Sequence, residues 1–228
     1  MKKGLSMIRY FWTCLIAVAF IHSTPCYAQD QLTKILDSIK KNYGSLSGLT
    51  VSYEREIVTK SMAMLGDAVK ADVATGQIYF MPPYFLKVQQ ETPTREILTT
   101  DGKTLWWYIP QKNQVHRYPT ERLGPELRLL SDVFRGLKGV EAGFVVSLKE
   151  EESAQELKLE LVPNPPWPDV THIDLYVKPG DYRIEKVEIY NILGGLTRFR
   201  LGDKIKEESF KEDFFRFKIP PGAKVIED

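Results

Sequence analysis

The sequence predicts an α+β fold in which one large antiparallel sheet curls on itself. About eleven short segments alternate apolar and polar residues, turns join most of them, and only two segments carry apolar residues at helical spacing. Strands with one apolar face and short connections are typical of antiparallel sheets, and a sheet of this size curls. One face can meet solvent, whereas the other must be covered by the helices or must enclose something.

The N-terminus of the 228-residue chain has the pattern of a secretory signal peptide. Three basic residues precede an uncharged apolar run over 10–21, and Cys26-Tyr27-Ala28 then places small residues at the −3 and −1 positions of a cleavage site. The run of about 12 residues is shorter than the roughly 20 that span a bilayer. We therefore expect cleavage after Ala28, rather than an uncleaved anchor or a lipidated Cys26, and a single exported domain over 29–228.

Removal of residues 1–28 changes the charge and the cysteine content. It removes three positive charges and no acids, so the formal net charge changes from +1 to −2, and both cysteines are lost. The mature chain then has no disulfide, no thiolate nucleophile and no cysteine metal ligand. Its near-neutral charge argues against a nucleic-acid partner, and 200 residues can build one hydrophobic core.

Helices are expected in two places, over 30–43 and from 125 to about 137. In the first, Leu32, Ile35 and Ile39 recur at helical spacing while the lysines face away. Proline starts the second, in which the residues sharing one face are Leu127, Leu130, Val133, Phe134 and Leu137.

Strands are expected in most of the remaining chain. Asp101-Gly102 predicts a hairpin turn between two of them, and residues 60–75 form a long connection whose arrangement the sequence does not decide. The expected strands are 49–57, 76–81, 85–90, 95–100, 105–109, 144–148, 156–162, 172–177, 183–189, 197–201 and 214–218.

The mature chain carries no recognisable pattern for catalysis, metal binding or a cofactor. Its two histidines, His116 and His172, stand apart from each other, and the elbow, zinc-protease and phosphate-loop motifs are missing. We therefore expect no catalytic residue, no metal, no cofactor and no enzyme activity. A periplasmic hydrolase on a curved sheet remains an alternative, which substitution of both histidines would test. A structural envelope protein that binds nothing is another.

Aromatic residues are concentrated in the first strands. Trp106-Trp107 places bulky rings on both faces of one strand, which is more than a sheet with one wet face needs. Both faces are therefore expected to be covered, one by a helix and one by a ligand or a lid. The aromatic residues of this region are Tyr79, Phe80, Tyr84, Phe85, Trp106, Trp107 and Tyr108.

Four segments resemble the LolA family of lipoprotein carriers. The most specific match is over 97–110, ILTTDGKTLWWYIP, which is similar to the family's apolar strand, D-G-K turn and L-W-x-Y strand. Residues 77–88, QIYFMPPYFLKV, resemble the early strand pair, and Pro93 then precedes the next strand. Residues 159–163, LELVP, and 215–225, FRFKIPPGAKV, resemble the mid-chain and closing segments.

The resemblance implies a fold and a task. The fold is an incurved antiparallel β half-barrel of about eleven strands, with helices forming a lid over its concave apolar face. The task is to bind the acyl chains of triacylated lipoproteins in the periplasm. A monomer would accept them from an inner-membrane lipoprotein-releasing ABC transporter complex and deliver them to an outer-membrane acceptor. The alternative is a relative of the same fold that senses lipids or envelope stress without shuttling.

The same resemblance, with strand alternation, places residues at the cavity and the lid. A one-residue error in register would move every side chain of a strand to the other face. The expected cavity residues are Phe80, Leu86, Val88, Leu98, Trp106 and Tyr108. The expected lid residues are Leu127, Leu130, Val133 and Phe134.

One position departs from the family. Many members have an arginine before the proline that matches Pro83, and that arginine is thought to hold the lid closed. Here the position is Pro82, which has neither a side-chain donor nor a charge. Lys87 or Arg95 could take over that role, or the cavity could stay more open.

Overall fold

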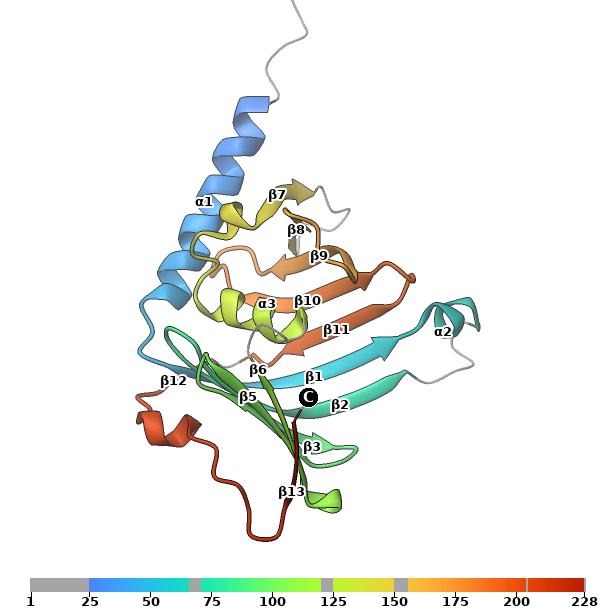
Figure 1. Ribbon diagram of the computed structural model, residues 1–228. Coiled ribbons are helices and arrows are strands. Elements are labelled where there is room, and N and C mark those ends of the chain that lie inside the picture. The colour runs from blue at the N-terminus through green and yellow to red at the C-terminus, as the bar shows by residue number, and fades with distance from the viewer. Residues whose placement is uncertain (1–24, 66–70, 120–124, 150–155, 204, 228) are drawn as a thin grey trace, which may run out of the picture.

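The computed structural model contains one sheet that curls into an open, unclosed half-barrel (Figure 1). It describes residues 25–65, 71–119, 125–149, 156–203 and 205–227. Within these ranges, 13 strands follow the order β13-β6-β5-β4-β3-β2-β1-β11-β10-β9-β8-β7, with β12 beside β1. The pairs along this path are antiparallel except for β13, which runs parallel to β6. The α+β half-barrel predicted from the sequence is confirmed.

The strands and helices have the following bounds. The strands are β1 (Leu49–Val58), β2 (Asp72–Met81), β3 (Phe85–Thr92), β4 (Glu96–Thr100), β5 (Thr104–Ile109), β6 (Gln114–Pro119), β7 (Phe144–Lys149), β8 (Leu157–Pro163), β9 (Val170–Val177), β10 (Ile184–Asn191), β11 (Leu196–Leu201), β12 (Lys206–Glu207) and β13 (Lys224–Glu227). The helices are α1 (Pro25–Gly44), α2 (Lys60–Leu65) and α3 (Pro125–Phe134), with short 3₁₀ turns at Pro110–Lys112, Val140–Ala142 and Glu212–Phe215.

The core lies on the concave face of the sheet, beneath α1 and α3. Strand alternation sends every second side chain to this face, and Leu161, Ile173 and Val187 are fully buried there. Helix α1 adds Ile35 and Ile39 to the same core. These contacts anchor α1 to the β7–β10 side, as Figure 1 shows.

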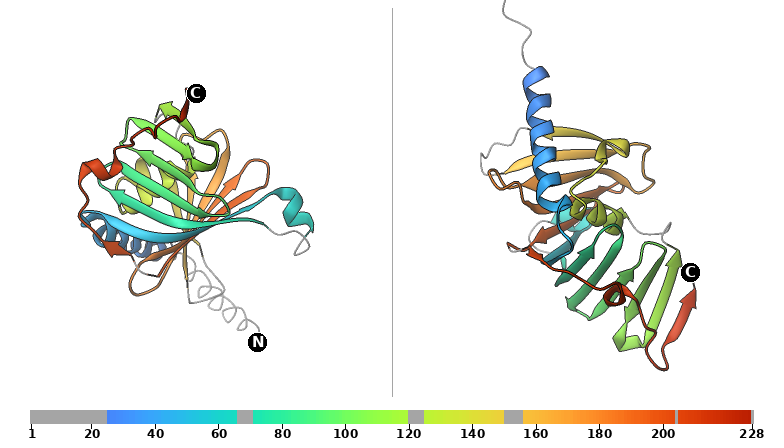
Figure 2. Two further views of the ribbon diagram at one scale, coloured as in Figure 1. Left: turned by 90° about the horizontal axis from the view of Figure 1, so that it is seen from below. Right: turned by 90° about the vertical axis from the view of Figure 1, so that its left-hand side faces the viewer.

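The convex face of β2–β5 is covered by the chain that follows β12. Figure 2 shows this C-terminal segment lying across the outside of these strands before it ends as β13. Phe215 is 1% exposed and packs 5.6 Å from the ring of Phe85. Phe210 and Phe214 lie 6.2 and 5.2 Å from Tyr79. This aromatic cover makes the region a three-layer structure, with α3 on one side of the sheet and the C-terminal segment on the other.

Most expected elements are present, and the differences have physical causes. The expected strand over 214–218 is wrong, because its phenylalanines pack onto the convex face and its backbone begins with a 3₁₀ turn. Strand β6 was not expected and completes the β5 hairpin, while β13 pairs with it. Strand β2 starts earlier than predicted because residues 72–75 pair with residues 54–57 of β1.

The expected signal peptide falls mainly on residues 1–24, which lie outside the described residues. Helix α1 begins at Pro25 and so includes the expected cleavage site after Ala28; cleavage stays a prediction. None of the described helices has the length and apolarity needed to cross a bilayer.

Candidate functional site

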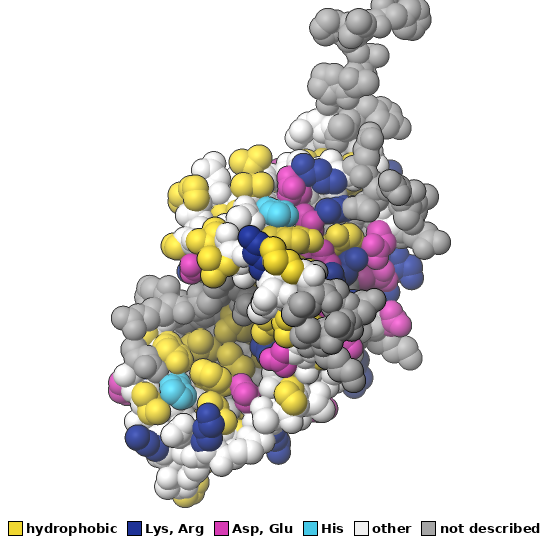
Figure 3. Space-filling model, turned by 90° about the vertical axis from the view of Figure 1, so that its right-hand side faces the viewer, with side chains coloured by type: hydrophobic (Ala, Val, Ile, Leu, Met, Phe, Trp, Pro, Cys, Tyr) yellow, Lys and Arg dark blue, Asp and Glu magenta, His cyan; other side chains and the backbone are white. Residues whose placement is uncertain are grey.

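A cavity of about 280 Å³ lies between α3 and the concave faces of β1, β3–β6 and β11. In the lower half of the molecule, Figure 3 shows hydrophobic side chains gathered in a hollow. The cavity differs from the sealed core under α1 because several of its wall residues are only partly buried. Its lining residues are Tyr53, Arg55, Val88, Gln90, Leu98, Leu105, Trp107, Tyr118, Leu127, Leu130 and Phe199.

The cavity is small for a lipid. Pockets that enclose drug-sized ligands usually measure about 300–1,000 Å³, and this one measures about 280 Å³. A ligand with several acyl chains therefore fits only if the cavity grows. Helix α3 forms one wall through Leu127 and Leu130, so its displacement is the simplest way to enlarge the space.

Helix α3 is held by apolar packing and by two arginines near its ends. Phe134 is fully buried, 5.9 Å from the ring of Phe80. Arg128 lies 5.4 Å from the ring of Trp167, and Arg135 lies 5.9 Å from the ring of Tyr84. Each such cation–π contact contributes roughly 0.5–1 kcal/mol at an exposed site, so the packing dominates.

Pro82 lies near the C-terminal end of α3. Pro82 and Pro83 border a surface pocket shared with Arg135, the residue that follows α3. Lys87 cannot hold α3, because it lies on the convex face, 4.4 Å from the ring of Phe214. Arg95 is exposed just before β4.

The expected cavity residues divide into two groups. Phe80 and Leu86 are buried on the concave face, and Val88 and Leu98 line the cavity. Their contact with lipid stays a prediction. The four expected lid residues also face this side: Leu130, Val133 and Phe134 are buried and Leu127 lines the cavity. Whether α3 moves as a lid stays a prediction as well.

The placement of Trp106 and Tyr108 near the cavity is wrong. Pairing of β4 with β5 sets Leu98 opposite Trp107, and directly opposed residues of an antiparallel pair share a face. Trp106 therefore points to the convex side, where it stacks 5.4 Å from Phe217, and Tyr108 lies 6.1 Å from the same ring. On β5 the missed cavity residues are Leu105 and Trp107, and the other lining residues that the sequence did not identify are Tyr53, Arg55, Gln90, Tyr118 and Phe199.

Polar groups occupy one side of the cavity. Arg55 donates from Nη2 to Oε1 of Gln90 over 3.2 Å, and Gln90 donates from Nε2 to the carbonyl of Thr94 over 2.9 Å. Trp107 donates from Nε1 to Oε2 of Glu96 over 2.9 Å. Burial raises the pKa of Tyr53 to about 12, although Arg55 acts in the opposite direction. The Tyr53 hydroxyl therefore stays protonated at neutral pH.

The two histidines do not form a common site. His116 is on β6 and lies 5.2 Å from the ring of Trp107, whereas His172 is on β9 and stacks 4.3 Å from Tyr190. The two strands are far apart in the sheet order. This separation gives no support to a hydrolase that uses both.

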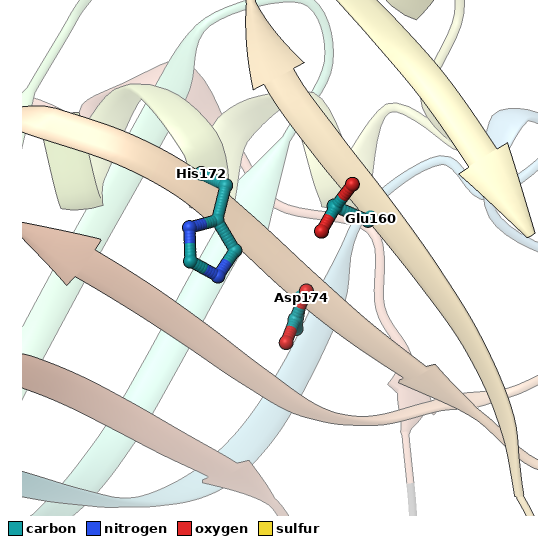
Figure 4. Close-up of side chains that lie close together, drawn as sticks. All are labelled: Glu160, His172 and Asp174. Carbon is teal, nitrogen blue, oxygen red and sulfur yellow. The ribbon is translucent and has the colours of Figure 1, made fainter. Parts of the chain in front are cut away.

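Glu160, His172 and Asp174 form a group that could hold a metal ion, with one ligand atom from each within 4.8 Å of the others (Figure 4). Both carboxylates already have cationic partners. Lys149 Nζ lies 2.8 Å from Glu160, and Lys158 Nζ lies 2.9 Å from Asp174. The hydrogen bond from Lys149 holds the pKa of Glu160 below its usual range. A metal ion would have to compete with two ammonium groups, so we assign none.

Comparison with known proteins identifies relatives over most of the chain. A family model described as outer membrane lipoprotein carrier protein LolA matches residues 63–218. The outer-membrane lipoprotein carrier protein of Pseudomonas paraeruginosa is 20% identical over 229 residues, covering 98% of this chain and 100% of the relative. The protein of the same name from Cupriavidus pinatubonensis is 25% identical over 202 residues, covering 87% of each.

Solved structures share the fold. An uncharacterized conserved protein from Thermus thermophilus superposes with a TM-score of 0.54 at 14% identity, covering 87% of this chain and 99% of that chain.

Proposed function

This chain belongs to the LolA family of outer membrane lipoprotein carriers, and we propose that it ferries lipoproteins across the periplasm. In this proposal residues 1–28 are removed on export, and the mature chain acts as a carrier rather than an enzyme. It would accept triacylated lipoproteins from an inner-membrane ABC transporter complex and deliver them to an outer-membrane acceptor. The observation that carries the proposal is the apolar cavity beneath α3.

A protein that carries an acyl chain through water needs such a cavity. Burial of an acyl chain contributes about 0.8 kcal/mol per CH₂, so a chain leaves a membrane only when another apolar site receives it. Val88, Leu98 and Leu105 offer apolar wall on the sheet side. Leu127 and Leu130 offer it on the side of α3.

Release also has to be possible, which requires a cavity wall that moves. Helix α3 has only ten residues and closes over the cavity with Leu127 and Leu130. Outward movement of α3 would enlarge the cavity, and its return would expel water or ligand. Lipid and partner proteins would then shift the balance between the open and closed forms.

The experiment is lipoprotein release from spheroplasts. Purified residues 29–228 are added to spheroplasts of the source organism, and newly made lipoproteins are sought in the soluble fraction, bound to the protein. Trp107→Glu places a charge in the cavity wall, and Trp106→Glu is the matched variant on the opposite face of the same strand. We expect release with the native chain, loss of release with Trp107→Glu, and retained release with folded Trp106→Glu.

Each outcome of that experiment has a clear meaning. Equal loss of release in both folded variants would contradict the cavity as the site of binding. No release with a folded native chain would contradict a general carrier, and acyl binding without release would then favour the lipid or envelope-stress sensor.

A further inference from the structure

Arg55 places a positive charge in the wall of the apolar cavity. It lies on β1 between Tyr53 and Ile57, at a position whose side chain points to the concave face, and its cross-strand partner on β11 is Phe199. Its side chain is half-buried and lines the same cavity as Leu98 and Leu130. Removal of a charged group from water is unfavourable unless hydrogen-bond acceptors replace the water.

The guanidinium is incompletely satisfied. A guanidinium has five N–H donors, and within the described residues Arg55 makes one hydrogen bond, from Nη2 to Oε1 of Gln90 over 3.2 Å. Its Nε is buried and has no acceptor among the described residues. The hydrogen bond from Gln90 to Thr94 fixes the glutamine, so Gln90 holds Arg55 in place without neutralising it.

Arginines on the convex face of the neighbouring strand are different. Arg198 lies 2.6 Å from carboxylate oxygens of both Glu56 and Glu188. Arg200 lies 2.8 Å from Glu54. No described carboxylate forms an ion pair with Arg55. Among the described residues, the arginines of the convex face are therefore ion-paired, whereas Arg55 on the cavity side is not.

We propose that Arg55 donates hydrogen bonds to the carbonyl oxygen at the head of a bound acyl chain, as found in an ester, an amide or a carboxylate. This inference rests on the proposed carrier function. It adds that the bound ligand has a polar carbonyl group at the end of its acyl chain. Apolar side chains hold the hydrocarbon, and Arg55 orients the end where the chain joins its head group. A guanidinium suits this role because it stays charged and offers several donors in one plane.

The test compares three ligands by direct binding to the mature chain. A synthetic triacylated cysteinyl peptide carries ester and amide carbonyls, palmitate carries a carboxylate, and hexadecanol has the chain without a carbonyl. The variant is Arg55→Met, which keeps an unbranched side chain and removes the donors. The matched control is Arg216→Met, because that arginine side chain is 72% exposed, outside the cavity.

We expect Arg55→Met to weaken binding of the triacylated peptide and of palmitate about 10-fold. Hexadecanol should bind the variant as well as it binds the native chain, and Arg216→Met should bind all three ligands normally. Weakening for palmitate alone would support the arginine–carbonyl contact and identify a free fatty acid as its source. Weakening for the peptide alone would identify the lipoprotein.

Two outcomes would overturn the inference, and they differ from failure of the carrier proposal. If Arg55→Met binds all three ligands like the native chain, or loses all three equally, Arg55 does not recognise the carbonyl. The carrier proposal survives both results. If the native chain binds neither acyl ligand, the carrier proposal fails, and the inference fails with it.

Discussion

The two halves of the curved sheet are stabilised in different ways. In the half formed by β7–β11, the concave face is sealed under α1, and Leu161 and Ile173 are fully buried. Its convex face carries a network of paired charges around Glu188. In the half formed by β2–β6, the concave face keeps a cavity, and the convex face is covered by aromatic rings of the C-terminal segment.

This contrast explains why the half formed by β2–β6 needs a cover on its convex face. A cavity leaves its wall residues without full packing contacts, and packing contacts supply much of the stability of a core. The aromatic layer on the convex face compensates, because Phe215 and its neighbours bury the outer side of the same strands. The half formed by β7–β11 acts as a scaffold, and the half formed by β2–β6 can keep an adaptable concave face.

The largest expected effect is from Phe215→Ala. Phe215 is 1% exposed and packs against Phe85 and Phe210 at 5.6 and 5.5 Å, so the variant should lose about 3–5 kcal/mol of unfolding free energy. Urea denaturation measures the loss. Phe214→Ala is the control, because Phe214 is 37% exposed and should cost much less. Equal, small losses would mean that the C-terminal segment does not stabilise this half.

Glu188→Gln tests the charged network on the convex face of β7–β11. Glu188 is 4% exposed and accepts hydrogen bonds from Arg198 at 2.6 Å and Tyr190 at 2.7 Å. Burial alone would raise the pKa of Glu188, but the hydrogen bonds from Arg198 and Tyr190 outweigh it and hold the pKa below its usual value of 4.5. Loss of a buried charged hydrogen bond should cost about 1.5–3 kcal/mol at pH 7.

The depressed pKa of Glu188 also sets a pH dependence. A carboxyl with a lowered pKa in the folded state contributes stability that is present above its unfolded pKa and is lost as the pH falls through the folded value. The native chain should therefore lose stability below about pH 4.5, and Glu188→Gln should lose less. Denaturation at pH 7 and pH 3 checks this. Glu54→Gln, at an exposed pair, should behave like the native chain, and a native pH profile in Glu188→Gln would contradict the assignment.

Gly136→Ala tests the contact between the turn after α3 and helix α1, which covers the half formed by β7–β11. Gly136 has a φ of 72°, and a Cβ there would lie 2.9 Å from the Cα of Lys40 in α1. The variant should lose about 1–2 kcal/mol through backbone strain and the close approach. Gly139→Ala is a matched control, because Gly139 has a φ of 74° with no atom within 4 Å of a Cβ. Thermal unfolding that shifts equally in both would show that the contact with α1 adds nothing.

The smallest effect is expected from Leu98→Ala in the cavity wall. Leu98 is only partly buried, so its truncation should cost about 1 kcal/mol or less, whereas Leu161→Ala in the sealed half should cost about 2–5 kcal/mol. Urea denaturation of both variants measures the contrast. A loss in Leu98→Ala as large as that in Leu161→Ala would mean that the cavity half is packed as tightly as the scaffold half.

Much of the fold could be predicted because it depends on local patterns. Alternation along β1, β3 and β8 and the Asp101-Gly102 turn identify strands and a hairpin before any tertiary contact is known. The segment over 214–218 shows the limit, because alternating phenylalanines can face a sheet without joining it. Strand β6 was missed for the opposite reason, since its pairing with β5 makes it a strand although Pro119 ends it.

The site was predictable only in part. The apolar phase of β3 and β4 placed Val88 and Leu98 on one face, but the step across the hairpin to Trp106 was wrong by one residue. The sequence feature that was overlooked is Arg55, a charged residue on the face of β1 that otherwise points apolar side chains toward the cavity.

The sequence by itself determined the alternation of apolar and polar residues along the strands, the helical spacing of α1 and α3, and the membership of a lipoprotein-carrier family. These features depend on residue type and spacing within short stretches, which the chain carries in any surroundings. Only the tertiary structure decided that Trp107 rather than Trp106 faces the cavity, that the C-terminal segment covers the convex face, and that Arg55 lacks a carboxylate partner among the described residues. Those facts depend on pairing between distant segments, because register and ion pairs are set by which strands meet.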